Sequence, residues 1–157
     1  MKDQSKNRLA LIHQRFARHA PAPESSRETF ERAFERTRDE VIRPVMEEIA
    51  AELRALGHAP EISVDPVDHE GRTCSPAIAL RLGIRGVTGR RNHVVFAVIH
   101  WKIGNRPTET QEVLAFHGKD ETPFDLFRYM SPGEITKDVV EQVLVDSIEG
   151  LFAQNAR

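Results

Sequence analysis

The most restrictive feature of the sequence is a long apolar stripe between residues 25 and 57. Its members follow one another at intervals of three or four: Phe30, Phe34, Thr37, Val41, Val45, Ile49, Leu53 and Leu56. This spacing places them on one face of an α-helix. About thirty residues at a rise of 1.5 Å each make a helix of roughly 45 Å. Ser25 and Glu28 fit the capping box that begins a helix, and Gly57 suits its end.

Pro44 interrupts this stripe. Proline lacks a backbone N–H and its ring clashes with the preceding turn, so we expect a kink near residues 40–44. The opposite face carries charges of alternating sign, which is typical of a solvated helix face. Upstream, the spacing of Leu9, Ile12 and Phe16 predicts a shorter amphipathic helix over residues 7–19.

After Gly57 the apolar period changes from that of a helix to two, the period of a β-strand. Strands are expected at 61–64, 77–85, 93–103 and 110–116, with 117–133 mostly loop and a final helix over 135–156. Short turns make neighbouring strands antiparallel. The sequence therefore predicts an α+β fold, a two-layer sandwich. It consists of a short N-terminal helix, a long kinked helix, a four-stranded antiparallel sheet and a C-terminal helix.

Length and composition favour one folded domain. The 157 residues are enough for a single core, and 39% are hydrophobic. We expect residues 1–157 to form a single domain in which the N-terminal helix, 1–20, could be partly mobile. One cysteine excludes an intramolecular disulfide, and the N-terminus has no apolar leader. A cytoplasmic protein without a membrane partner is expected.

The middle of the chain is basic although the net charge is only −2. Residues 71–108 contain seven Lys or Arg and no acid, whereas residues 109–157 contain ten acids and four bases. If strands 77–85 and 93–103 form a hairpin, its basic side chains could make one surface. These candidates are Arg81, Arg85, Arg90, Arg91, His100 and Lys102. Such a surface could contact phosphates of a nucleic acid, keep an edge hairpin soluble, or meet an acidic protein.

A second polar segment lies in the loop that follows the first strand. It contains Asp65, Asp68, His69, Glu70 and Cys74. Carboxylates and histidine could bind a divalent metal, but aspartates before such a loop also suit turn chemistry. Neither the calcium-loop spacing nor a zinc motif is present. We therefore expect no metal and no cofactor.

No catalytic motif is found: the nucleophile elbow, the phosphate-binding loop and the dinucleotide fingerprint are all missing from the sequence. We therefore expect a protein that binds and does not catalyse. The leading interpretation is a protein–protein interaction module, such as an adaptor, chaperone or immunity-type protein. A homodimer is expected because the long stripe needs more cover than one sheet provides, with Phe30 and Phe34 at the interface.

Two alternatives stay open. The first is a nucleic-acid-binding protein that uses the basic hairpin 81–102. The second is a small-ligand-binding protein with a pocket between the sheet and the long helix. The pocket requires that the small residues Ala77, Ala79 and Gly83 face the helix.

Overall fold

A computed structural model of the chain describes residues 2–16, 24–65, 76–87, 92–104, 106–119 and 125–156. The helices are α1 (Asp3–Phe16), α2 (Glu24–Thr37), α3 (Arg43–Ala55) and α4 (Lys137–Asn155), with a π-helical turn η1 (Arg38–Ile42) and a 3₁₀ turn η2 (Pro132–Glu134). The strands are β1 (Glu61–Val64), β2 (Ala77–Arg81), β3 (Asn92–Ile103), β4 (Arg106–Lys119) and β5 (Asp125–Met130).

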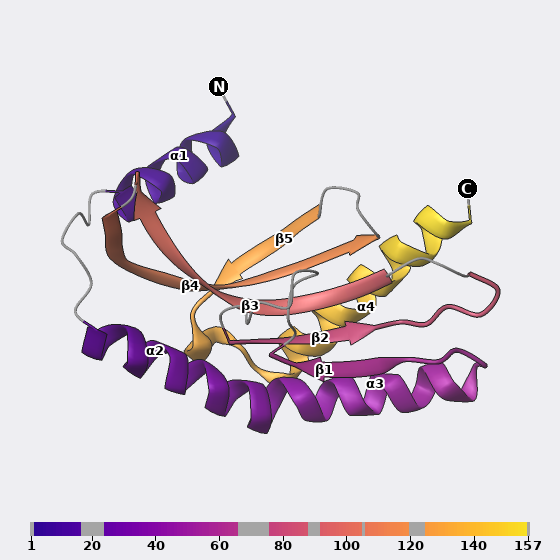
Figure 1. The fold of residues 1–157 in the computed structure, drawn as a ribbon. Helices are drawn as coiled ribbons and strands as arrows, with labels where there is room; N and C mark the ends of the chain where they lie inside the picture. The colour runs from indigo at the N-terminus through magenta and orange to yellow at the C-terminus, as the bar shows by residue number, and fades with distance from the viewer. Residues whose placement is uncertain are drawn as a thin grey trace.

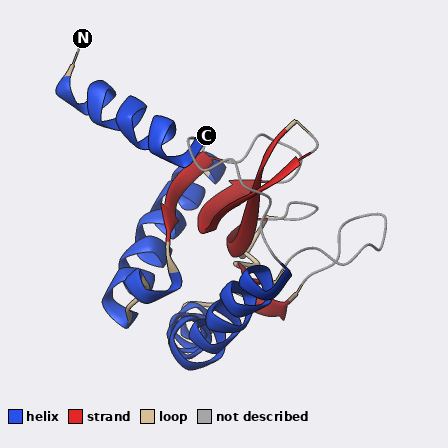
Figure 2. Ribbon diagram, turned by 90° about the vertical axis from the view of Figure 1, so that its left-hand side faces the viewer, coloured by secondary structure: helices blue, strands red, loops and turns tan. Residues whose placement is uncertain are grey.

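The fold is α+β, with helices packed against an antiparallel sheet (Figure 1). Within the described ranges the strands form one sheet in the sequence order β1-β2-β3-β4-β5, and each pair of neighbours is antiparallel. Figures 1 and 2 show α2, α3 and α4 gathered against one face of the curved sheet. In both views α1 stands away from this helical layer.

The four strands expected from the sequence are all present, and β5 adds a further strand at the sheet edge. The segment that forms it was expected to be loop. Its pairing with β4 contains a register shift between Ala115 and Phe116, so a strict alternation of apolar and polar residues is not required of it. β4 is also longer than expected, since it begins at Arg106 and runs to Lys119.

The long helix is continuous but irregular, as Pro44 predicted. Between α2 and α3 the chain makes a π-helical turn in which the N–H of Arg43 donates to the carbonyl of Arg38. This i to i−5 bond adds one residue to the turn just before Pro44. The helix bends at this turn (Figure 1). The kink expected near residues 40–44 is therefore present as a π-helical turn.

The π-helical turn changes which side chains of the long helix face the sheet. Ile42, Met46 and Ala50 are fully buried, although the stripe identified in the sequence omitted them. Leu56, the last member of that stripe, is 71% exposed. An inserted residue rotates the following helix by about 100° relative to the preceding one, so a single periodicity cannot describe both halves.

Alternation within β2 gives the strand an inner and an outer face. Ile78 and Leu80 are fully buried and belong to the core between sheet and helices. Ala77, Ala79 and Arg81 therefore face away from the helical layer. The sheet contributes further fully buried side chains to this core, among them Val94, Phe96, Val113 and Ala115.

β2 ends at Arg81, earlier than expected, because the backbone turns sharply at Gly83. Gly83 has a φ of 57°, a conformation that glycine adopts without strain. Its carbonyl accepts a 2.9 Å hydrogen bond from the N–H of Ala59. A Cβ at this position would lie 2.0 Å from the Ala59 carbonyl oxygen. Gly83 therefore permits close contact between the end of β2 and the segment that follows α3.

Candidate functional site

The basic residues of the predicted hairpin do not form one surface among the described side chains. Arg81 is exposed on the face away from the helices, where its guanidinium forms an ion pair with Glu61 of β1. Arg85 lies beyond the end of β2. Its backbone N–H donates to Nδ1 of His58, and its side chain lies near Gly57 at the end of the long helix. Arg81 therefore lies on the sheet, whereas Arg85 lies beyond it, next to the end of the long helix.

His100 lies on the opposite side of the sheet from Arg81. Its Nε2 is 2.9 Å from Oε1 of Glu31 in α2, and only 12% of its side chain is exposed. Its other ring nitrogen is buried without a hydrogen-bond partner, as is Oε1 of Gln111, which is its cross-strand neighbour. His100 thus joins the helical layer to the sheet, and it is not part of an open basic face.

The remaining candidates of the basic segment are Arg90, Arg91 and Lys102. Arg90 and Arg91 lie outside the described residues, and for Lys102 only the backbone, in β3, is described. Of the described members, Arg81 is neutralised by Glu61 and His100 contacts Glu31. The described part of the segment therefore gives little support to a phosphate-binding surface.

The two phenylalanines expected at a dimer interface lie against the core of the chain itself. Phe34 is fully buried, and Phe30 is partly buried against the same core. A buried side chain has no surface to offer to a second copy. Phe34 is therefore a core residue and not a contact residue.

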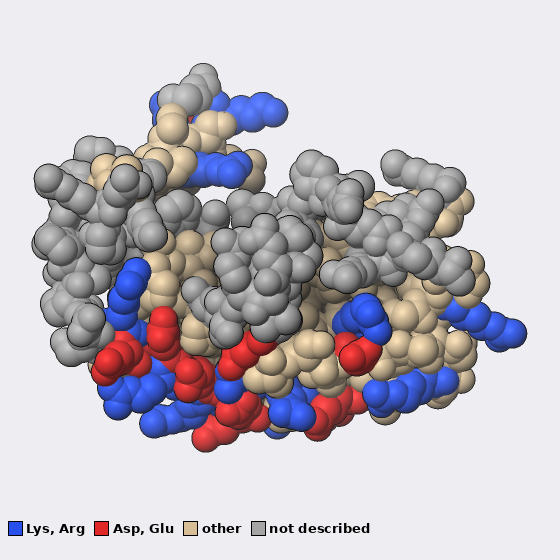
Figure 3. Space-filling model, in the orientation of Figure 1, with Lys and Arg blue, Asp and Glu red and all other residues tan. Residues whose placement is uncertain are grey.

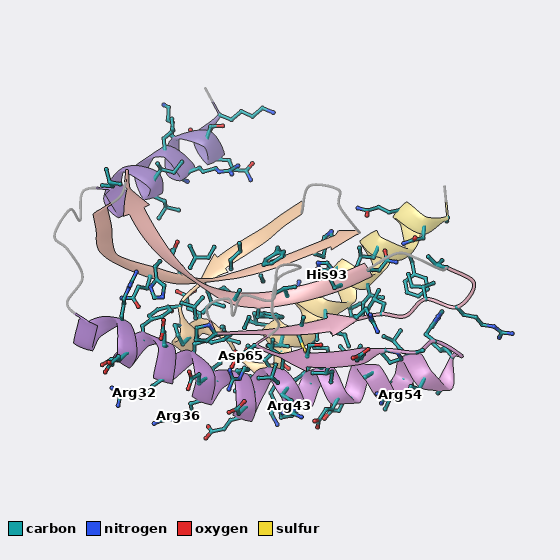
Figure 4. All side chains as sticks on the ribbon, in the orientation of Figure 1. Arg32, Arg36, Arg43, Arg54, Asp65 and His93 are labelled. Carbon is teal, nitrogen blue, oxygen red and sulfur yellow. The ribbon has the colours of Figure 1, made fainter. Side chains whose placement is uncertain are left out.

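Arg38 is a buried charge that the sequence pattern did not single out. It follows Phe34 by one helical turn and is therefore directed toward the sheet, and only 10% of its side chain is exposed. Its Nη1 lies 3.0 Å from Oδ1 of Asp65, and its Nε lies 2.9 Å from Oδ1 of Asp39. In Figure 4, Asp65 lies between the long helix and the sheet.

Asp65 also fixes the start of the loop that was considered as a metal site. The same Oδ1 accepts a 2.9 Å hydrogen bond from the N–H of Ala77, and the N–H of Asp65 donates to the Ala77 carbonyl. Its φ is 47°, in the left-handed region where aspartate is more frequent than most residues. The described contacts of Asp65 are therefore structural.

Burial and the neighbouring negative charges shift the pKa of Arg38 in opposite directions. Burial alone would lower the pKa of its guanidinium because it penalises the charged form. The hydrogen bond to Asp39 and the negative charges of Asp65, Asp39 and Glu35 outweigh this effect and raise the pKa above its ordinary value. Arg38 therefore stays charged inside the fold.

The other members of the possible metal loop, Asp68, His69, Glu70 and Cys74, lie outside the described residues. Among the residues that the structure does describe, no group of three or more His, Cys, Asp or Glu comes together in a way that could hold a metal ion.

The small residues of β2 do not line a space between the sheet and the long helix. The positions that face the helix belong to Ile78 and Leu80, which are fully buried. Ala77 and Ala79 alternate with them and lie on the other face, and Gly83 packs against Ala59. The arrangement on which the small-ligand pocket depended is therefore not found.

The outer face of the long helix is charged but evenly mixed. Arg32 pairs with Glu28 at 3.4 Å and Arg43 with Glu47 at 3.2 Å, each one turn apart. Figure 3 shows basic side chains interspersed with acidic ones along this helix, and Figure 4 shows the labelled arginines on its outer side. Pairs of this kind are a solvated face and need no partner.

The most unusual exposed surface belongs to α1. Leu9 is 53%, Leu11 51% and Ile12 37% exposed, and every residue from Lys2 to Ile12 is exposed. The short amphipathic helix expected from the sequence is present, but the described part of the chain does not cover its apolar side chains.

α4 has an exposed face that is mostly negative. Asp138, Glu141, Asp146 and Glu149 are exposed on it with a single base, Lys137. Val145 lies among these acids and is 51% exposed. We call Asp138, Glu141, Val145, Asp146 and Glu149 the α4 acidic face.

Comparison of the chain with protein-family models, with curated proteins and with solved structures finds no significant match. Among the described helices, none has both the length and the apolar character needed to cross a membrane.

Proposed function

We propose that the protein is a non-catalytic protein–protein interaction module that contacts its partner through α1. The observation that carries the proposal is the exposure of Leu9, Leu11 and Ile12 on a helix that stands apart from the other helices. An uncovered apolar helix face gains free energy when a partner covers it. Complete burial of one such side chain is worth about 1.5–3 kcal/mol.

The spacing of these side chains suits helix recognition. Leu9 and Ile12 are three residues apart, and Phe16 continues the series in the sequence. Proteins that bind an amphipathic helix in a groove contact its apolar side chains at positions i, i+3 and i+7, which is the spacing of these three residues. Lys6 and Arg8 are exposed on the same helix, which favours a partner with an acidic surface.

Affinity capture with matched variants tests this proposal. Leu9→Glu places a charge in the apolar stripe of α1, whereas Leu56→Glu places the same charge on an exposed leucine at the end of the long helix. We expect the wild-type protein and Leu56→Glu to retain the same bound protein and Leu9→Glu to lose it. Because both leucines are more than half exposed, neither change should unfold the chain. Equal retention by all three proteins would refute a role for α1.

A further inference from the structure

We infer that the partner of α1 is a second copy of this chain, and that α1 of one copy docks on the α4 acidic face of the other. This inference rests on the proposed role of α1 as a contact helix, and it names the partner that α1 contacts. Two exposed apolar sites of the chain are surrounded by charges of opposite sign.

On α1 the apolar stripe is bordered by basic side chains. Lys6 lies three residues before Leu9, and Arg8 lies four residues before Ile12, so each base is a surface neighbour of an apolar anchor. From Lys2 to Ile12 the chain carries three bases, Lys2, Lys6 and Arg8, and one acid, Asp3. This surface is apolar at its centre and positive around it.

On α4 the pattern is reversed. Val145 follows Glu141 by four residues and precedes Glu149 by four, so both carboxylates are its surface neighbours. Four acids and one base are exposed between Lys137 and Glu149. This surface therefore has an apolar centre with negative charge around it, complementary to α1.

Within one chain, these two surfaces do not cover each other. Leu9 and Ile12 on α1, and Val145 on α4, all keep exposed surface. A two-fold dimer would form the contact twice, because α1 of each copy meets α4 of the other. Both exposed sites are then covered in each copy.

Charge reversal in two halves tests the contact. The first variant, Lys6→Glu/Arg8→Glu, makes α1 negative. The second, Glu141→Lys/Glu149→Lys, makes the α4 face positive. Sedimentation equilibrium at tens of micromolar protein and low salt should find a dimer for the wild-type chain. For each variant alone, the dissociation constant of the dimer should be at least tenfold higher.

Mixing the two variants is the decisive step. In a heterodimer, the negative α1 of the first variant meets the positive α4 of the second, and the unchanged α1 and α4 meet in the other contact. An equimolar mixture should therefore dimerise again, which also shows that both variants are folded. A matched control, Glu48→Lys/Glu52→Lys, reverses two exposed acids of α3 and should leave the dimer unchanged.

Four outcomes would overturn the inference: a monomeric wild-type chain, a dimer that is insensitive to either reversal, a mixture that does not recover, or a control that dissociates as strongly. The proposed function fails separately. If the wild-type chain is monomeric but captures another protein in a manner that depends on Leu9, the inference is overturned while the role of α1 as an interaction helix is retained.

Discussion

Asp65 is joined to Arg38 by a 3.0 Å contact between Oδ1 and Nη1, although the two residues are 27 positions apart in the sequence. The contact ties the π-helical turn of the long helix to the point where the chain leaves β1. Because the same oxygen also accepts from the N–H of Ala77, one carboxylate holds the helix and two strands in register.

Removal of this carboxylate should destabilise the fold. Asp65→Ala removes one of the two carboxylates that accept a hydrogen bond from the Arg38 side chain, and it removes an acceptor from the N–H of Ala77. We expect a loss of about 1–3 kcal/mol in the free energy of unfolding, less than for a fully buried pair because Asp65 is partly exposed. Urea denaturation measures it. The control Glu47→Ala removes an exposed pair with Arg43 and should cost at most about 0.5 kcal/mol. If Asp65→Ala and Glu47→Ala lose the same free energy of unfolding, Asp65 does not have the structural role described here.

The contribution of Arg38 should not depend on pH in the ordinary range. A group with a raised pKa in the folded state stabilises the fold below its unfolded pKa, and the effect is lost only as the pH rises through the folded pKa. For arginine both pKa values lie well above the neutral range. The difference in unfolding free energy between the wild type and Arg38→Met should therefore stay constant from neutral pH to about pH 10. If the difference in unfolding free energy disappears within this pH range, a group other than Arg38 is responsible for it.

Gly83 and Gly86 should respond very differently to alanine. Both have positive φ values, 57° and 81°, so both substitutions cost about 1 kcal/mol or more in backbone strain. A Cβ at Gly86 meets no atom within 4 Å, whereas at Gly83 it would collide with Ala59. We expect Gly86→Ala to fold with a modestly lower Tm and Gly83→Ala to lose several times more stability or fail to fold. Similar melting temperatures for the two variants would contradict the close approach.

Nucleic-acid binding should be weak, because Arg81 is paired with Glu61 and His100 with Glu31. Fluorescent single- and double-stranded DNA and RNA can be titrated between about 50 and 200 mM salt, the range over which phosphate contacts lose affinity steeply. We expect no tight, salt-dependent complex. Tight binding that is lost in Arg90→Glu/Arg91→Glu would instead establish the basic hairpin as a nucleic-acid surface.

The sequence predicted those parts of the fold that depend on local periodicity. The long helix follows from spacing within one element, and its irregularity follows from Pro44. Which face of β2 turns inward was left open by the sequence, and the burial of Ile78 and Leu80 decides it. The burial of Ile42 was missed because the π-helical turn shifts the phase of the helix partway along the stripe.

Contacts between distant segments could not be read from local patterns. Arg38 looks like one more arginine of a charged helix until Asp65 is brought beside it. Gly83 looks like a weak point in a strand until Ala59 packs against it. The partners of Arg81 and His100 could not be predicted for the same reason, since the acids that pair with them come from β1 and α2.

Site-specific photo-crosslinking at Leu9, in cells that make the protein naturally, shows whether α1 contacts another protein. A photoreactive phenylalanine derivative replaces Leu9 in one sample and Glu52, an exposed residue of α3, in another. If α1 is the contact helix, position 9 should give a discrete protein adduct that position 52 does not give. If position 9 gives no adduct, or both positions give the same pattern, the account of α1 as an interaction helix is wrong.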